Sequence, residues 1–122
     1  MKVFPIIPVP KPRMTVSDRW KKRPAVLRYR KYADDLRFLA DSQNYQIINP
    51  LSLVFVLPMP KSWSKKKKKF MDGKPHCSRP DLDNLIKAFQ DALAEEDSYI
   101  HTYGKMHKMW GYDGKIIIFD YI

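Results

Sequence analysis

The acidic residues of this chain gather in one short stretch. Of its thirteen Asp and Glu residues, six fall between positions 81 and 97, and Lys87 is the one basic residue in that interval. The six are Asp81, Asp83, Asp91, Glu95, Glu96 and Asp97. Carboxylates that converge repel one another unless a cation lies between them. Their oxygen atoms suit a hard divalent ion such as Mg²⁺, which can activate water and stabilise charge on a phosphate.

The spacing places part of this cluster along one side of a helix. Asp83, Lys87 and Asp91 recur every four residues and would line one face. The apolar positions fall on another face and predict an amphipathic helix from Asp81 to about Glu96: Leu82, Leu85, Ile86, Phe89 and Leu93. Asp97 follows the end of this helix, and a strand that runs back along the helix could bring it near Asp83.

A purely structural interpretation of the same residues stays open at this point. Asp81 is a good N-cap residue, and Asp83 in the first turn favours the helix dipole. The pair Asp83 and Lys87 would then be an ordinary helix-surface pair worth about 0.3 kcal/mol. An Asp-x-Asp motif alone does not decide between metal binding and capping.

The rest of the chain is strongly basic. Twenty-three Lys and Arg residues against thirteen acids give a net charge of +10, and a phosphate backbone is the commonest partner for such an excess. The candidate DNA-binding residues are Lys11, Arg13, Lys21, Lys22, Arg23, Lys65, Lys66, Lys67, Lys68, Lys69 and Arg79. The alternative is that the lysine run is a solvated loop and the early basic segment an arm that aids solubility.

Two aromatic residues flank the lysine run. Trp63 precedes it and Phe70 follows it. Either ring could stack on an unpaired base at a branch point in DNA, and either could instead anchor the loop to the core. The sequence leaves these two interpretations equal.

The remaining pattern predicts one small α+β domain over residues 1–122. We expect a mixed sheet of about four strands with two helices, in the order β-α-β-α-β-β. The expected strands are residues 3–9, 51–57, 99–109 and 115–121, the expected helices are residues 25–42 and 81–96, and residues 61–73 are expected to be a loop. The glycine-rich turn Gly111–Gly114 predicts that the last two strands form a hairpin.

Other classes of protein fit less well. Cys77 is the single cysteine, so no internal disulfide can form, which suggests a reducing cytoplasm. No apolar run approaches the roughly 18 residues of a membrane span, and the first residues do not resemble a secretory signal. We therefore expect a cytoplasmic protein with no membrane partner.

At this point the motifs resemble a known family. The segment Arg79–Leu93, with its Asp-Leu-Asp-Asn-Leu-x-Lys core at 81–87 and Asp-Ala-Leu at 91–93, followed by Glu96-Asp97, is similar to the signature of the RusA-type Holliday junction resolvases. Residues 10–13, 60–68 and 73–76 also resemble members carried by phages. The likeness extends over roughly residues 4–120.

The resemblance implies a homodimeric endonuclease that depends on Mg²⁺, for which Mn²⁺ can substitute. It implies metal binding by Asp81, Asp83 and Asp97, with Lys87 as the essential basic residue. Apart from the resemblance, Asp91 could support the metal site from beside it or be a simple surface partner of Lys87, and we favour the supporting position. The chain departs from the family pattern after Leu93, because only three residues precede Asp97 where many relatives have a longer turn. Glu95 or Glu96 is therefore an alternative third ligand.

The expected function is resolution of four-way DNA junctions by paired nicks, in recombination and repair. Two rivals remain: an accessory protein that binds DNA without cutting it, and a nuclease that acts on other branched DNA such as flaps or forks.

Overall fold

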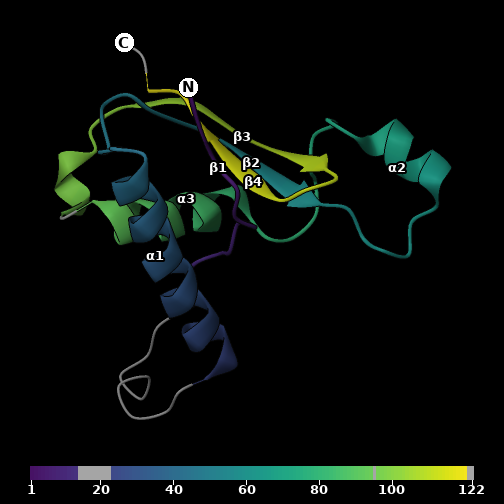
Figure 1. The fold of residues 1–122 in the computed structure, drawn as a ribbon, viewed down its shortest axis with the longest axis horizontal. Helices are drawn as coiled ribbons and strands as arrows, with labels where there is room; N and C mark the ends of the chain where they lie inside the picture. The colour runs from purple at the N-terminus through teal and green to yellow at the C-terminus, as the bar shows by residue number, and fades with distance from the viewer. Residues whose placement is uncertain (14–22, 95, 121–122) are drawn as a thin grey trace.

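The computed structural model describes residues 1–13, 23–94 and 96–120, without the side chain of Asp97. It is a small α+β domain with a four-stranded mixed sheet and three α-helices (Figure 1). Its elements in chain order are β1 (Lys2–Phe4), α1 (Pro24–Ser42), β2 (Leu51–Pro58), α2 (Lys65–Met71), α3 (Leu82–Leu93), the 3₁₀ turn η2 (Asp97–Tyr99), β3 (Tyr103–Gly111) and β4 (Lys115–Ile118).

The sheet is built around β2. The strand order is β1-β4-β2-β3, with β2 parallel to β3 and antiparallel to β4, which in turn is antiparallel to β1. All residues from Leu53 to Leu57 in β2 are buried. A strand with neighbours on both edges and little exposure on either face needs a continuous apolar run, which this segment supplies.

The predicted hairpin between the last two strands is wrong. β3 and β4 do not pair with each other, because β2 lies between them and pairs with both. The turn Gly111–Gly114 therefore crosses the end of β2, where the Met59 N–H donates to the Gly111 carbonyl at 3.0 Å. The apolar run of β2 favours the central position more strongly than the glycine-rich turn favours a hairpin.

Two further expectations need correction. The lysine run lies in the helix α2 and is not a loop, so the described residues contain three α-helices and not two. Its N-cap is Ser64, whose side chain accepts a hydrogen bond from the Lys67 N–H at 3.1 Å. The first strand ends at Phe4 and not at residue 9, because Pro5, Pro8 and Pro10 cannot donate to a sheet ladder.

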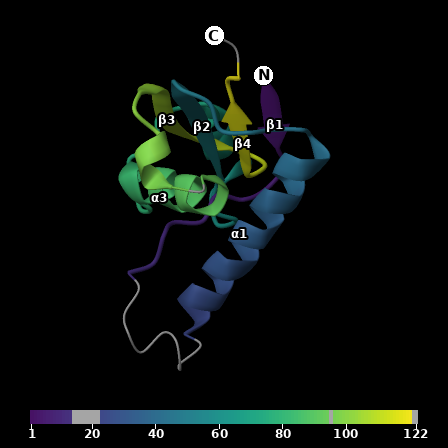
Figure 2. The same cartoon turned by 90° about the vertical axis from the view of Figure 1, so that its left-hand side faces the viewer.

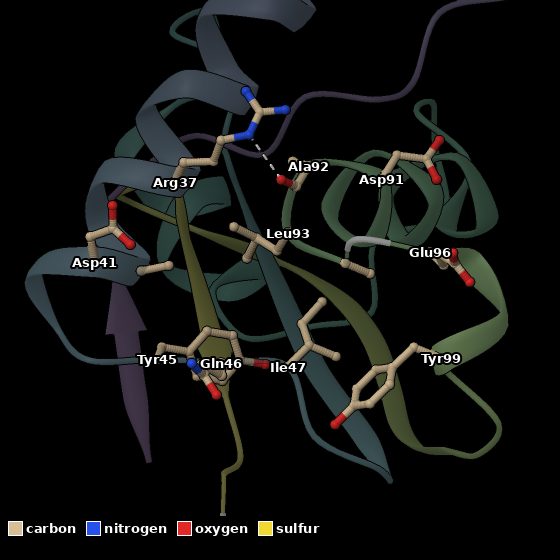
Figure 3. Close-up of a pocket in the computed structure, with 12 residues that line it drawn as sticks. Arg37, Asp41, Tyr45, Gln46, Ile47, Asp91, Ala92, Leu93, Glu96 and Tyr99 are labelled. Atoms are coloured by element: carbon tan, nitrogen blue, oxygen red, sulfur yellow. Dashed lines mark hydrogen bonds between the residues drawn. The ribbon is translucent and has the colours of Figure 1, made fainter.

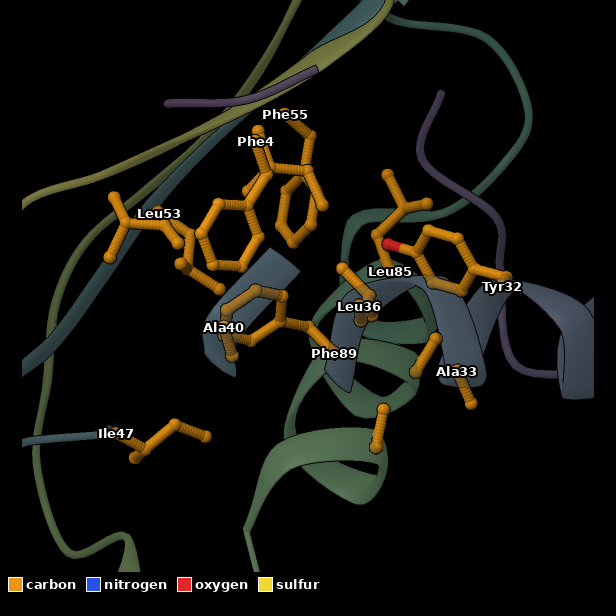
Figure 4. Close-up of a cluster of buried hydrophobic side chains, with 14 of the residues drawn as sticks. Phe4, Tyr32, Ala33, Leu36, Ala40, Ile47, Leu53, Phe55, Leu85 and Phe89 are labelled. Atoms are coloured by element: carbon orange, nitrogen blue, oxygen red, sulfur yellow. The ribbon is translucent and has the colours of Figure 1, made fainter. Parts of the chain in front are cut away.

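Helices α1 and α3 lie on the same face of the sheet (Figure 2). The core forms where they meet it: Phe4 and Phe55 from the sheet pack with Leu36 of α1 and Phe89 of α3, all fully buried (Figure 4). The rings of Phe4 and Phe89 have centroids 6.5 Å apart. Burying each such side chain contributes about 1.5–3 kcal/mol. This packing fixes the rotation of α3 about its axis, and with it the direction in which its charged residues point.

Candidate active site

Asp81 and Asp83 lie together at the N-terminal end of α3. Asp81 is the N-cap residue, with extended backbone angles, yet its side chain makes no capping hydrogen bond. Asp83 is in the first turn, and its Oδ1 accepts a hydrogen bond from the Asn84 N–H at 2.9 Å. Both residues are exposed. The capping interpretation is therefore not realised by Asp81.

A groove of about 680 Å³ opens beside Asp81. One wall is the N-terminal segment Ile7–Lys11, which is held against α3 by a hydrogen bond of 3.1 Å from the Lys11 N–H to the Asn84 carbonyl. Arg28 of α1 and Arg79 of the loop before α3 also line the groove. Guanidinium groups bind phosphate oxygens in a forked geometry. The groove thus combines a carboxylate that can bind metal with two cations that can bind phosphate.

The loop before Asp81 is held by Lys108 of β3. The Lys108 ammonium donates to the carbonyl oxygens of Ser78 at 2.6 Å and of Pro80 at 2.7 Å. The same loop is tied to β3 through the His76 N–H, which donates to the Lys108 carbonyl at 3.1 Å. Hydrogen bonds from a charged donor are about twice as strong as neutral ones. β3 therefore fixes the position from which α3 begins.

His76 also helps to hold the loop before Asp81. It is buried and its ring packs on Trp110, with centroids 4.1 Å apart. Its Nδ1 accepts a hydrogen bond from the Ser78 N–H at 3.4 Å. Burial lowers the pKa of His76, and the positive charge of Lys108 lowers it further. The neutral imidazole therefore acts as a packing and hydrogen-bonding group behind the loop.

Asp91 joins two lysines further along α3. Its carboxylate lies 3.2 Å from the Lys87 ammonium and 3.1 Å from the Lys11 ammonium. Lys11 also contacts Tyr29, whose hydroxyl is 3.3 Å away and whose ring centroid is 4.4 Å away. Lys11, predicted to bind DNA, thus pairs with Asp91 in the structure. Asp91 in turn holds Lys87, one turn along the helix from Asp83.

The third predicted ligand lies partly outside the described residues. The side chain of Asp97 is not described, and its backbone begins η2, just after the C-terminal end of α3. A helix of twelve residues is about 18 Å long, so Asp97 starts from the end of α3 opposite to Asp81. Within residues 1–13, 23–94 and 96–120, no three His, Cys, Asp or Glu side chains form a group that could hold a metal ion.

A larger pocket, of about 810 Å³, lies at that opposite end (Figure 3). Asp41, Asp91 and Glu96 line it with a single arginine, Arg37. The Arg37 Nε donates to the Ala92 carbonyl at 3.1 Å, which satisfies an acceptor at the C-terminal end of α3. The Asp91 carboxylate is already paired with Lys11 and Lys87, which leaves Asp41 and Glu96 with one arginine at this pocket. The smaller groove at Asp81 contributes two arginines and is the better candidate site for a polyanion.

The predicted DNA-binding residues lie in several separate parts of the structure. Arg79 lines the groove at Asp81, and the lysines 65–69 lie in α2. Arg13 and Arg23 are exposed and joined by a hydrogen bond of 2.7 Å from the Arg23 side chain to the Arg13 carbonyl. Lys21 and Lys22 lie outside the described residues.

Sequence reasoning missed Arg28, Asn84 and Lys108. Lys108 could have been noticed, because it interrupts an alternating pattern in β3: Met106 packs against the core and Trp110 is buried, two residues to either side. A lysine at an inward position needs an acceptor, and here the loop carbonyls supply it. Arg28 had no such signal, because nothing in the order of residues shows that α1 crosses the start of α3.

Comparison with known proteins supports one family. No curated protein and no solved structure shows significant similarity to the chain. None of the described helices is long and apolar enough to cross a membrane. A family model, described as endodeoxyribonuclease RusA, matches residues 5–116. The chain therefore belongs to the RusA endodeoxyribonuclease family, and this membership implies an endonuclease that acts on Holliday junctions.

Proposed function

We propose that this protein resolves four-way DNA junctions by paired, Mg²⁺-dependent nicks in opposing strands, as a step in DNA recombination and repair. The observation that carries the proposal is the groove at the start of α3, where the carboxylate of Asp81, unused for capping, lies beside Arg28 and Arg79. Family membership supplies the reaction class and the substrate.

The donor set fits a hard divalent cation. Asp81 and Asp83 are exposed and offer only carboxylate oxygens, the ligands that Mg²⁺ and Mn²⁺ prefer. Asp97 is the proposed third ligand, with Glu96 as the alternative; because both follow the opposite end of α3, either would reach Asp81 and Asp83 only if the segment after α3 moved toward the groove. When bound, the metal would supply a water of lowered pKa and neutralise charge on the reacting phosphate.

The protein's own side chains would place the DNA. Arg28 and Arg79 can grip phosphate oxygens on both sides of the groove. Lys87, steered by its ion pair of 3.2 Å with Asp91, adds positive charge near Asp83. Lys108 keeps the loop before Asp81 in place through two carbonyls. Positioning of this kind lowers the barrier because the groups are aligned before the reaction begins.

A homodimer is part of the proposal. One site cuts one strand, so two nicks placed across a junction need two sites held in a fixed relation. A dimer with two-fold symmetry matches the symmetry of the four-way junction. Mass measurement by light scattering, with and without junction DNA, tests this part; a monomer in both conditions would contradict it.

The test of the function is a cleavage assay on a synthetic four-way junction with labelled strands. We expect paired nicks with Mg²⁺ or Mn²⁺ and none with EDTA. The variant Asp83→Asn should bind the junction in EDTA as tightly as the wild type and cut it at least about 100-fold more slowly. Asp113→Asn, at an exposed position in the loop between β3 and β4, is the matched control and should cut normally.

Four outcomes would redirect the proposal. Cleavage in EDTA, or a normal rate for Asp83→Asn, would show that the site is misplaced. Binding without product in any metal would indicate an accessory DNA-binding protein. Faster cleavage of flaps or forks than of the junction would keep the nuclease and change its substrate.

A further inference from the structure

Helix α2 stands away from the rest of the domain (Figure 1). None of its seven residues is buried. A helix this short is marginal in water on its own, and five consecutive lysines distribute like charges around its whole circumference. Nothing in the packing of the core requires such an element, so its form needs another explanation.

Trp63 anchors the base of α2. Its ring packs on Trp110 of β3, with centroids 4.8 Å apart, and the Lys67 ammonium lies 4.3 Å from the centroid of the Trp63 ring. The returning chain pairs with the same part of β3, because the Gly73 N–H donates to the Trp110 carbonyl at 2.9 Å. Of the two aromatic residues that flank the lysine run, Trp63 is therefore the structural one.

Phe70 is placed differently. It retains 68% of its surface exposed, and the Lys74 ammonium lies 4.4 Å from its ring centroid. Residues 61–74 contain seven lysines and one acid, Asp72. An exposed aromatic ring surrounded by positive charge does not suit an apolar protein partner. Nucleic acid offers both complementary groups, since phosphates neutralise the lysines and every base has a face on which a ring can stack.

We propose that α2 is a DNA-binding arm whose lysines hold the backbone near the branch point and whose Phe70 stacks on a base face that is exposed there. Trp63 fixes the arm and does not touch DNA. The choice of a junction as the DNA rests on the proposed function. Stacking needs a base face that is not already covered by its neighbour, and a branch point interrupts the stacking between arms whereas continuous duplex does not.

The experiment measures binding by the full chain in EDTA, so that no cleavage interferes. Two probes are compared: a four-way junction with 2-aminopurine at the branch point, and a duplex with the same base in its middle. We expect Phe70→Ala to weaken junction binding about tenfold or more, to change duplex binding little, and to abolish the fluorescence change at the branch point. Phe70→Trp, which retains a stacking face, should restore junction binding, whereas Phe70→Leu should not.

Matched controls distinguish a specific role of α2 in DNA binding from a general effect of substitution on binding or folding. Phe38 on α1 is also exposed, at 72%, and Phe38→Ala should leave junction binding unchanged. The double variant Lys66→Gln with Lys69→Gln should weaken both probes and reduce the dependence of binding on salt. Because Phe70 is exposed, Phe70→Ala should have the thermal midpoint of the wild type, so that lost binding cannot be attributed to unfolding.

The inference fails if Phe70→Ala binds the junction like the wild type, or if it loses junction and duplex binding equally. Its failure is distinguishable from that of the proposed function. If Phe70→Ala binds the junction normally and the wild type nicks DNA in a metal-dependent manner, only the DNA-binding role of α2 is refuted. If Phe70→Ala selectively loses junction binding but the wild type never nicks DNA, the DNA-binding role of α2 stands and the proposed nuclease function is refuted.

Discussion

The Nζ atom of Lys108 lies 2.7 Å from the carbonyl oxygen of Pro80, the residue directly before Asp81. A second carbonyl, that of Ser78, is 2.6 Å from the same atom. We expect Lys108→Met, which retains the chain length but not the ammonium, to release this loop and slow junction cleavage about 10- to 100-fold. Single-turnover rates at saturating DNA measure the effect.

The same variant should bind the junction in EDTA within about threefold of the wild type, because the ammonium is committed to the loop and not to phosphate. Lys105→Met, at an exposed position of the same strand, is the control and should cut normally. If Lys108→Met lost binding in proportion to its loss of rate, Lys108 would be a DNA contact and not a positioning residue.

Asp91 should matter for both stability and rate. Its carboxylate, with a side chain only 16% exposed, bridges the ammonium groups of Lys11 and Lys87. Asp91→Asn retains the shape and removes the charge. We expect a loss of about 1 kcal/mol in the free energy of unfolding, because the pairs are partly shielded from water. Cleavage should also slow, because Lys87 loses the partner that directs it.

Urea denaturation and the junction assay measure the two effects of Asp91→Asn. Asp35→Asn is the matched control, since Asp35 forms an ion pair of 2.9 Å with Lys31 on an exposed face of α1. An exposed pair at this spacing contributes no more than about 0.5 kcal/mol. Equal losses in the two variants would show that the bridge made by Asp91 has no special role.

Much of the fold follows from local patterns in the sequence. The apolar spacing of residues 25–42 predicted α1 to within one residue of its observed start, and the closed apolar run at residues 51–57 predicted β2. The pairing of strands could not be found in this way. Placing β2 between β3 and β4 depends on contacts between residues far apart in the chain, whereas the turn at Gly111 gives only local information.

The candidate site, like the fold, could be predicted only in part from the sequence. Asp81 and Asp83 are close in sequence and share one helix end, so their proximity was predictable. Arg28 reaches the groove only because α1 packs across α3, and Lys108 because β3 runs back along α3. The strand does run back as expected, but the residue it brings to the start of α3 is Lys108, while Asp97 begins at the far end.

The identity of the third metal ligand is open to direct test. We expect Asp97→Asn to reduce cleavage at least about 100-fold and Glu96→Gln to change it little. The Glu96 carboxylate already accepts a hydrogen bond of 3.3 Å from the Ser98 hydroxyl, and it lines the acidic pocket away from the groove (Figure 3). Rates measured across a Mg²⁺ titration check this, and the opposite ranking would assign the ligand to Glu96.

The lowered pKa of His76 should make the free energy of unfolding depend on pH. Burial lowers its pKa in the folded protein, and the unfolded value is near 6.5. Between these two values the unfolded chain binds a proton that the folded protein does not. The free energy of unfolding should therefore be at its full value above about pH 7 and fall as the pH drops below 6.5, by at most about 1.4 kcal/mol per pH unit for one group.

Urea denaturation from pH 5 to pH 8 measures this slope. His76→Phe preserves a ring against Trp110, at the position where the centroids are now 4.1 Å apart, and removes the titration. We expect this variant to lose less stability than the wild type as the pH falls, whereas His101→Gln, at an exposed position, should follow the wild type. A slope unchanged in His76→Phe would mean that other groups set the acid sensitivity, and that the protonated imidazole is tolerated beside Lys108.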